Sequence, residues 1–412
     1  DFISGHMDLA KRTGAAIYAP ASADCQFDHQ PLEEDDTIEL EHMRLSVLET
    51  PGHTPEHISY VVTDTTRGQA PVGVFVGDTL FVGDVGKPDH FPERAEELAG
   101  KLYHSLHDKL LTLPDFCEVY PAHGAGSLCG RAMGAKQRST IGYERAFNKA
   151  LQIKDKKEFI ASLTNDMPPA PDHFSRCSEI NRRGPALTSS LPGLEELDPS
   201  AFKQEAEKKD TIVLDVRSYD GFGSQHVPGA WNIDFGGNFP TFAGWVLPLD
   251  KEILLVANNF SQASKAKIWA QRVGVDSIRG FLTGSMFAWA TAGLRTKNVN
   301  QISAEGLHDM VCCGSDFLLL DARSPAEYAA NHIEGAVNIP APDLRTRFAE
   351  LDKDKPVAII CSTGHRSSLG ASILLQHGFT NILNVAGGMT GYSAADYTKV
   401  CKVCANVHGS RY

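Results

Sequence analysis

The strongest constraint on the fold is an internal repeat in the C-terminal half of the chain. The motif LDVRS at 214–218 returns as LDARS at 320–324, and HVPGAWNI at 226–233 returns as HIEGAVNI at 332–339. Both pairs are 106 residues apart, and a repeat of that length is a whole domain rather than a solenoid unit. Each copy has the pattern strand, helix, strand, loop, helix. That pattern predicts two α/β domains with parallel sheets.

The repeated motifs, LDxRS and then H-I/V-x-G-A-x-N-I, resemble the rhodanese family over most of each copy. We expect a first copy at residues 190–297, a second copy at 298–398 and a C-terminal tail at 399–412.

The second copy contains a candidate nucleophile. Its apolar run VAII leads into the loop CSTGHR at 361–366, which is followed by a helical pattern. By the rhodanese resemblance, Cys361 takes up sulfane sulfur. Backbone N–H groups at the helix start and the Arg366 guanidinium favour thiolate and persulfide anions, whereas a merely structural cysteine needs neither. We therefore predict Cys361 and Arg366 as catalytic residues. The predicted substrate-binding residues are the rest of the loop: Ser362, Thr363, Gly364 and His365.

The first copy lacks this chemistry. Its strand EILLV leads into ANNFSQ, so that Ala257 stands in place of Cys361 and Gln262 in place of Arg366. Covalent sulfur transfer needs a thiol. We therefore expect the first copy to be an inactive, structural or docking domain.

Three turns in the N-terminal part suggest a metal site. PGHT contains His53, GDTLF contains Asp78 and YPAH contains His123, each after an apolar strand-like run. Side chains at strand ends, with Gly or Pro making the turn, can converge on one metal. Taken singly, an Asp at a strand end is usually a turn former.

The three turns in this order resemble the metallo-β-lactamase fold, and GDTLFVGDVGKPD resembles its glyoxalase II and persulfide dioxygenase branch. The resemblance implies an αββα domain at residues 1–170. The opening DFISGH fits the tail of the family's His-x-His-x-Asp-His motif, so the first strands and two histidines would precede residue 1. Phe2 takes the place of the final His. A phenyl ring cannot bind metal, which favours a one-metal site.

One metal held by two His and one Asp matches the set that non-haem Fe(II) uses, with positions open for substrate and O2. By the resemblance, His53 and Asp78 are ligands, the third His lies upstream of residue 1, and His123 lies near the site. We expect one Fe(II) in each full-length chain and poor metal binding by these 412 residues alone. Three nearby residues are interpreted as polar loop residues satisfied by backbone or water: His57, Asp84 and His90.

Two further segments complete the domain plan. Apolar residues recur at helical spacing between Ser139 and Leu163, which predicts a helix that closes the first domain. Residues 171–189 fall in a stretch rich in Pro, Gly and Ser, which predicts a linker on the domain surface.

Composition narrows the function. The chain of 412 residues is 42% apolar and 22% charged, as expected of a soluble globular protein with several domains. A net charge of −12 argues against nucleic acid or anionic membrane as a partner. Nine cysteines do not form an evident disulfide framework, which favours the cytoplasm. Cys401 and Cys404 form a lone CxxC, interpreted as incidental or mildly redox-active. Dimers are common among soluble proteins, so a homodimer is one candidate oligomeric state.

The whole arrangement resembles the persulfide dioxygenase–rhodanese fusions of bacterial sulfide detoxification. That resemblance implies an enzyme that oxidises a low-molecular-weight persulfide with O2 to sulfite and makes thiosulfate through a Cys persulfide. Glutathione and coenzyme A are the candidate thiol carriers. One alternative is a glyoxalase II-like thiolester hydrolase with zinc. Another is a non-catalytic persulfide-binding or sensing protein.

Overall fold

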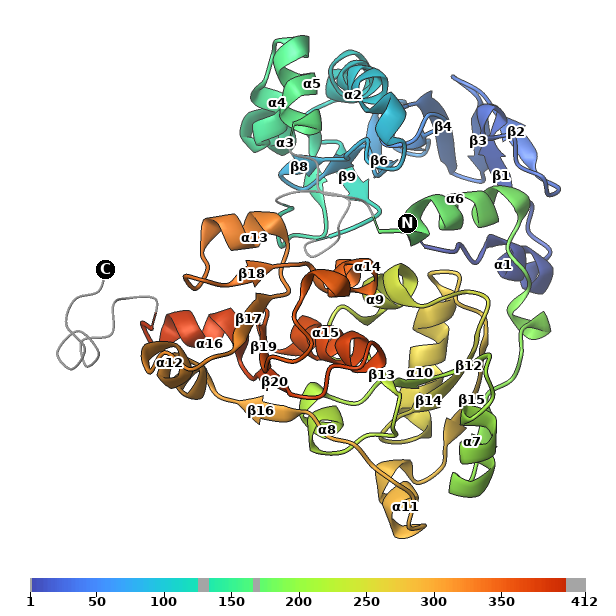
Figure 1. Ribbon diagram of the computed structural model, residues 1–412. Helices are drawn as coiled ribbons and strands as arrows, with labels where there is room; N and C mark the ends of the chain where they lie inside the picture. Colours follow the sequence, from blue (N-terminus) through green and yellow to red (C-terminus); the bar gives the residue numbers. More distant parts are fainter. Residues whose placement is uncertain (1, 125–132, 166–170, 398–412) are drawn as a thin grey trace. The chain divides into compact units, whose positions relative to one another are not determined.

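The computed structural model describes residues 2–124, 133–165 and 171–397, which form two compact units, Asp1–Ser189 and Ser190–Tyr412 (Figure 1). Within those described ranges, no helix is long and apolar enough to cross a membrane. Asp1 of the N-terminal motif and the pair Cys401 and Cys404 lie outside the described residues.

A six-stranded mixed sheet forms the centre of the first unit. Its order is β10-β9-β6-β5-β4-β3, with β6 and β9 parallel and all other neighbours antiparallel. The strands are β3 (Thr37–Leu40), β4 (Met43–Glu49), β5 (Ile58–Asp64), β6 (Pro71–Gly77), β9 (Glu118–Pro121) and β10 (Ser139–Thr140). Two small pairs accompany it: β1 (Tyr18–Pro20) with β2 (Gln30–Leu32), and β7 (Leu80–Phe81) with β8 (Asp84–Val85).

Helices cover one face of this sheet because alternate strand residues are apolar and point to that side. Val61, Val74 and Val119 of the sheet share a buried core with Leu102 and Phe159 of the helices. The helices of the unit are α1 (His6–Thr13), α2 (Ala95–His104), α3 (Ile141–Phe147), α4 (Lys149–Gln152), α5 (Lys156–Thr164) and α6 (His173–Arg183).

The structure corrects two predictions of secondary structure. The single helix predicted between 139 and 163 is three helices, because Asn148 and Asp155 each cap a new helix start with their side chains. The predicted linker contains α6, whose Phe174 and Cys177 are buried. Asn181 on α6 also accepts a hydrogen bond from the Ser4 N–H, which ties this helix to the first unit.

The second unit contains two five-stranded sheets with the same topology. The orders are β11-β15-β14-β12-β13 and β16-β20-β19-β17-β18, and every neighbouring pair is parallel. The first copy has β11 (Glu195–Leu197), β12 (Thr211–Asp215), β13 (Trp231–Asn232), β14 (Glu252–Val256) and β15 (Ile278–Leu282). The second copy has β16 (Asn300–Ile302), β17 (Leu318–Asp321), β18 (Val337–Asn338), β19 (Val357–Ile360) and β20 (Ile382–Val385). The predicted parallel α/β class is confirmed.

The repeated motif makes the same buried contacts in both copies. Arg217 Nη2 lies 2.6 Å from Asp215 Oδ2, and Arg323 Nη2 lies 2.6 Å from Asp321 Oδ2. Asp215 is the last residue of β12 and Asp321 the last residue of β17, and both strands lie inside their sheets. The LDxRS motif is therefore a structural device that fixes the loop after that strand, and it does not distinguish an active copy from an inactive one.

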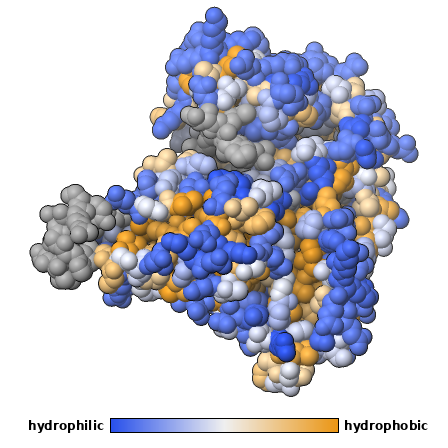
Figure 2. Space-filling model, in the orientation of Figure 1, coloured by the Kyte–Doolittle hydropathy of each residue, from blue (hydrophilic) through white to orange (hydrophobic). Residues whose placement is uncertain are grey.

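Helices sandwich each sheet. In the second copy, Ala358 and Ile360 of β19 pack in a core with α12 (Ala304–Cys312) and α16 (Gly388–Ala394), while Ile359 packs against Gly370 of α15 (His365–Gln376). On the face drawn in Figure 2, hydrophobic residues gather over the second unit. The helices are α7 (Pro199–Ala206), α8 (Tyr219–Ser224), α9 (Phe239–Val246), α10 (Phe260–Gln271), α11 (Ser285–Thr291), α12 (Ala304–Cys312), α13 (Pro325–Ala330), α14 (Leu344–Arg347), α15 (His365–Gln376) and α16 (Gly388–Ala394).

Candidate functional site

Cys361 lies in a cradle of hydrogen-bond donors between β19 and α15. Its side chain is buried, and Sγ accepts from the Gly364 N–H at 3.1 Å and from the Ser367 hydroxyl at 3.3 Å. The loop leads into the N-terminus of a 12-residue helix, whose free N–H groups and dipole favour an anion there. The position suits an anionic sulfur.

The start of α16 holds the carbonyl groups of this loop. Met389 N–H donates to the Cys361 carbonyl at 2.7 Å, and Thr390 N–H donates to the Ser362 carbonyl at 3.0 Å. Gly388 makes this contact possible: its φ is +52°, and a Cβ there would overlap the Cys361 carbonyl oxygen. With the carbonyl groups held by α16, the loop presents the Gly364 N–H to the sulfur.

Arg366 has a carboxylate partner that the sequence analysis did not foresee. Its guanidinium makes two hydrogen bonds to Glu327, at 2.6 and 2.7 Å, and also contacts the Ser362 hydroxyl. Burial alone would raise the pKa of Glu327, but Arg366 outweighs it and brings the pKa to about 2. Arg366 therefore binds the loop to α13 instead of donating directly to the sulfur.

The other predicted loop residues have different environments. Thr363 is exposed, whereas Gly364 is buried with a φ of +113°. His365 Nδ1 lies 2.9 Å from Asp234 Oδ2, a residue of the first copy.

In the first copy the corresponding loop has no sulfur chemistry. Ala257 is buried, and the Gln262 side chain bonds to the backbone on both sides, accepting from the Asn258 N–H and donating to the Val216 carbonyl. The Gln262 side-chain amide therefore holds the loop in place by bonding to two backbone groups.

The metal-capable turns of the first unit lie together. His53 Nε2 is 3.5 Å from Asp78 Oδ2, and His123 Nε2 is 3.3 Å from Asp78 Oδ1. His57 supports them from behind, because its Nε2 accepts from the Asp78 N–H at 3.2 Å. Its interpretation as a residue satisfied by the backbone matches this contact.

Burial puts these groups in protonation states that bind metal. Burial lowers the pKa of His53 to about 4, so its ring is neutral. Burial raises the pKa of Asp78, but His123 and His53 outweigh it and bring the pKa to about 2. Neutral imidazole and ionised carboxylate are the forms that ligate metals.

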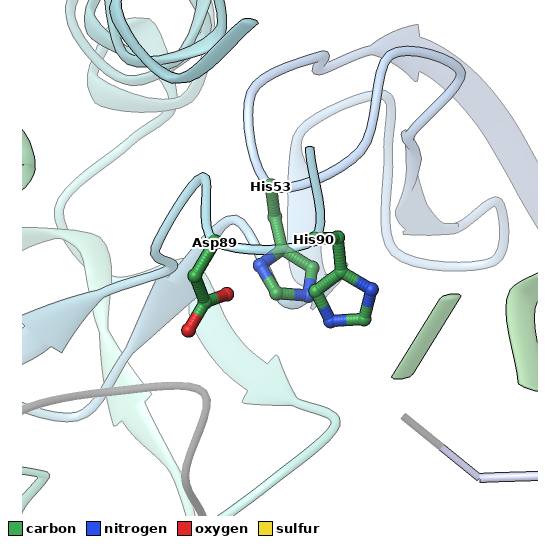
Figure 3. Close-up of side chains that lie close together, drawn as sticks. All are labelled: His53, Asp89 and His90. Atoms are coloured by element: carbon green, nitrogen blue, oxygen red, sulfur yellow. The ribbon is translucent and has the colours of Figure 1, made fainter. Parts of the chain in front are cut away.

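A second cluster shares His53. Ligand atoms of His53, Asp89 and His90 all lie within 4.8 Å of one another, and Figure 3 shows the three side chains turned toward one region. Lys87 Nζ forms an ion pair with Asp89 at 3.1 Å. His90, interpreted from the sequence as a polar loop residue, lies against the His53 ring because the turn after β8 brings the two rings together.

The donor set fits a metal ion. His53 Nδ1 lies 2.6 Å from the Lys87 carbonyl, so this nitrogen carries the proton and Nε2 keeps its lone pair for a ligand bond. Asp78 Oδ1 is buried and has no well-aligned hydrogen bond within the described residues. A cation placed between these atoms would satisfy both.

Comparison with known proteins agrees with a metal-binding first unit and two rhodanese copies in the second. The model of the Rhodanese-like domain matches residues 198–292 and 303–395. The chain is 36% identical over 95 residues to a sulfurtransferase of Allochromatium vinosum, covering 23% of this chain and 89% of the relative. This chain belongs to the rhodanese family. The rhodanese domains follow an ETHE1-like metallo-β-lactamase domain, as two further likenesses show.

A structure of a metallo-β-lactamase from Staphylococcus aureus is 33% identical, with a TM-score of 0.60, and covers 68% of this chain and 80% of that chain. The mouse mitochondrial persulfide dioxygenase ETHE1 is 31% identical over 150 residues, covering 36% of this chain and 52% of the relative. The chain spans about half the length of the curated persulfide dioxygenases that it matches.

Proposed function

We propose that this protein acts in persulfide metabolism, with a sulfurtransferase site at Cys361 and an iron-dependent persulfide dioxygenase site in the first unit. The observation that carries the proposal is the cradle of the Gly364 N–H and the Ser367 hydroxyl around Cys361 Sγ. The likeness to the A. vinosum sulfurtransferase and to mouse persulfide dioxygenase ETHE1 supports it.

Sulfur transfer at Cys361 has two steps. The thiolate attacks the outer sulfur of a persulfide, the S–S bond breaks, and the carrier thiolate leaves with the electron pair. The sulfur atom of sulfite then attacks the outer sulfur of the Cys361 persulfide, which gives thiosulfate and returns the thiolate. Gly364 and Ser367 stabilise the negative charge on Cys361 Sγ, which is the attacking thiolate in the first step and the leaving group in the second.

In the first unit, His53 and Asp78 would hold one iron ion. A bound Fe(II) supplies the activation of O2 needed to oxidise a persulfide to sulfite. The Lys87 carbonyl fixes the tautomer of His53, and His123 Nε2 lies 3.3 Å from the second oxygen of Asp78. Because both sites are on one chain, tethering raises the effective concentration of one near the other to roughly millimolar.

Two variants of the full-length protein test the division of labour. Cys361→Ser replaces an ionisable thiol by a hydroxyl that stays protonated near neutral pH. This variant is expected to consume O2 with persulfide at close to the parent rate while it accumulates sulfite and makes little thiosulfate. His53→Ala is expected to lose iron and O2 uptake but to retain transfer of sulfur from thiosulfate to cyanide. The measurements are iron content, O2 uptake and separate assays of sulfite, thiosulfate and thiocyanate.

Matched controls are Cys313→Ser, an exposed cysteine of the second copy, and His104→Ala, an exposed histidine of the first unit. Both controls are expected to match the parent. If Cys361→Ser still makes thiosulfate at the parent rate, the sulfurtransferase site is misplaced. Two tightly bound zinc ions with thiolester hydrolysis, and no persulfide-dependent O2 uptake, would favour the hydrolase alternative.

A further inference from the structure

The first rhodanese copy is in contact with the sulfur-transfer loop of the second. Three of its side chains touch that loop or the first turn of the helix after it: Tyr219, Asn232 and Asp234. The Tyr219 ring closes on Gly364, so that a Cβ there would lie 3.0 Å from it. Asn232 accepts a buried hydrogen bond from the Ser368 hydroxyl at 2.6 Å. These contacts place the first copy, which has Ala257 in place of the cysteine, beside the loop that contains Cys361.

Asp234 is the charged member of this set. One carboxylate oxygen, Oδ2, lies 2.9 Å from His365 Nδ1 and also accepts from the Tyr219 N–H. The other oxygen, Oδ1, accepts from the Gly236 N–H at 2.8 Å. The side chain is only 5% exposed, so it is a fixed anion and not a solvated surface group.

His365 is well placed to meet a substrate. It follows Gly364, the residue whose N–H contacts the Cys361 sulfur, and its side chain is 35% exposed. Asp234 binds Nδ1, and within the described residues no hydrogen bond involves Nε2. A ring held on one nitrogen and open on the other can donate to a ligand in the loop.

We propose that Asp234 is a positioning residue of the sulfur-transfer site, supplied by the inactive copy, that holds His365 as a second donor for anionic sulfur compounds. The inference rests on the proposed function of Cys361 and names the substrate class that it selects: small sulfur oxyanions such as thiosulfate and sulfite. Arg366 is already bound by Glu327, so the His365 donor adds a charge that the loop otherwise lacks.

The surroundings of His365 favour its charged form. The hydrogen bond that the His365 ring donates to Asp234 raises the pKa of His365, burial opposes it, and Asp220 adds a smaller favourable effect. Burial raises the pKa of Asp234, but His365 and two backbone N–H groups outweigh it, so this pKa lies below its ordinary value. The other groups around His365 are the Tyr219 ring, which meets it edge-on, and the neighbouring Arg366.

The test uses thiosulfate as donor and cyanide as acceptor, with the full-length protein. The donor step breaks the S–S bond of thiosulfate, leaves its outer sulfur on Cys361 and releases sulfite. Thiosulfate keeps its charge over the working pH range, so the pH dependence of its KM reports on the protein. In the parent, KM is expected to rise as pH rises through the elevated pKa of His365.

Asp234→Asn is expected to raise the KM for thiosulfate about tenfold at neutral pH, because a neutral imidazole has lost a charge-assisted bond. The rise of KM with pH should move down toward the ordinary His pKa of about 6.5, while kcat at saturating thiosulfate changes by less than about threefold. His365→Gln should show the same high KM without the pH dependence, and the double variant should be no worse than His365→Gln alone.

Asp210→Asn is the control, since Asp210 is a surface carboxylate of the same copy and pairs with Lys251. It should behave as the parent. A folded Asp234→Asn protein with parent KM at every pH would overturn the positioning role, as would an unchanged KM in His365→Gln. A parent protein that transfers no sulfur from thiosulfate would refute the proposed function itself.

Discussion

Glu327 and Arg366 occur together in the second copy, while the first copy has Gly221 and Gln262 at the corresponding positions. The copy with the thiol therefore also has the carboxylate and the guanidinium, and the copy without the thiol has neither. Arg366 is only partly exposed, and Glu327 also accepts from the Ser324 N–H in a capping box at the start of α13. One carboxylate thus links a helix cap to the sulfur loop.

Glu327→Gln is expected to destabilise the protein by about 1 kcal/mol at neutral pH, because Arg366 loses a charge-assisted pair that water partly screens. It should also lower the rate of sulfur transfer, since the loop loses its tie to α13. Thermal unfolding and a thiosulfate–cyanide assay measure the two effects.

The pH dependence of that variant has a definite sign. The pKa of Glu327 in the folded protein, about 2, is lower than the ordinary Glu value of about 4.3. Its contribution is full above the ordinary pKa and is lost as pH falls toward the folded pKa. The stability difference between parent and variant should therefore shrink below about pH 4. Glu350→Gln is the control: Glu350 makes the same two-bond pair with Arg347 at the surface and should change stability little.

Sequence reasoning found the residues that stand in contiguous motifs, such as Cys361 and Asp78. It missed Glu327 and Asp234, which lie 39 and 131 residues from their partners. A side chain that acts through a distant partner leaves no local pattern. Comparison of the two copies was the one available signal, because SPAEY in the second copy replaces SYDGF in the first.

At the scale of elements, the pattern of the chain predicted the parallel sheets of both copies, since buried strands and helices alternate there without interruption. The pattern did not predict the helix ends between residues 139 and 163, because side-chain capping there outweighs the helical spacing of apolar residues. Asn148 interrupts the apolar spacing by offering its side chain to a backbone N–H, and the chain turns instead of continuing one helix. The predicted linker failed for the opposite reason: α6 is polar on average, yet it buries Phe174 and Cys177.

The contact between α16 and the sulfur loop gives a prediction for an element. Gly387 and Gly388 both have a positive φ, but only at Gly388 would a Cβ overlap the Cys361 carbonyl. Gly387→Ala should cost about 1 kcal/mol of stability from backbone strain alone. Gly388→Ala should cost that and also displace the loop, with a loss of sulfur transfer of roughly tenfold or more. Thermal unfolding and the transfer assay on both variants check this; equal activity in the two would contradict it.

For the whole molecule, the two copies are expected to differ in more than one atom. Adding Ala257→Cys to a Cys361→Ser protein should restore almost no sulfur transfer, staying within about twofold of the Cys361→Ser background. The new thiol would have Gln262 in place of an arginine and no counterpart of Glu327. Thiocyanate formation is the measurement. Turnover near that of the parent would show that a cysteine alone makes a copy active.

The strand order of the two copies also constrains synthesis on the ribosome. Leu197 of β11 pairs with Leu282 of β15, and Ile302 of β16 pairs with Val385 of β20. The first strand of each copy therefore pairs only with the last strand. Neither sheet can be completed until nearly the whole copy has been translated. Nascent chains halted before β20 would expose the edges of β16 and β19, which makes such intermediates prone to aggregation.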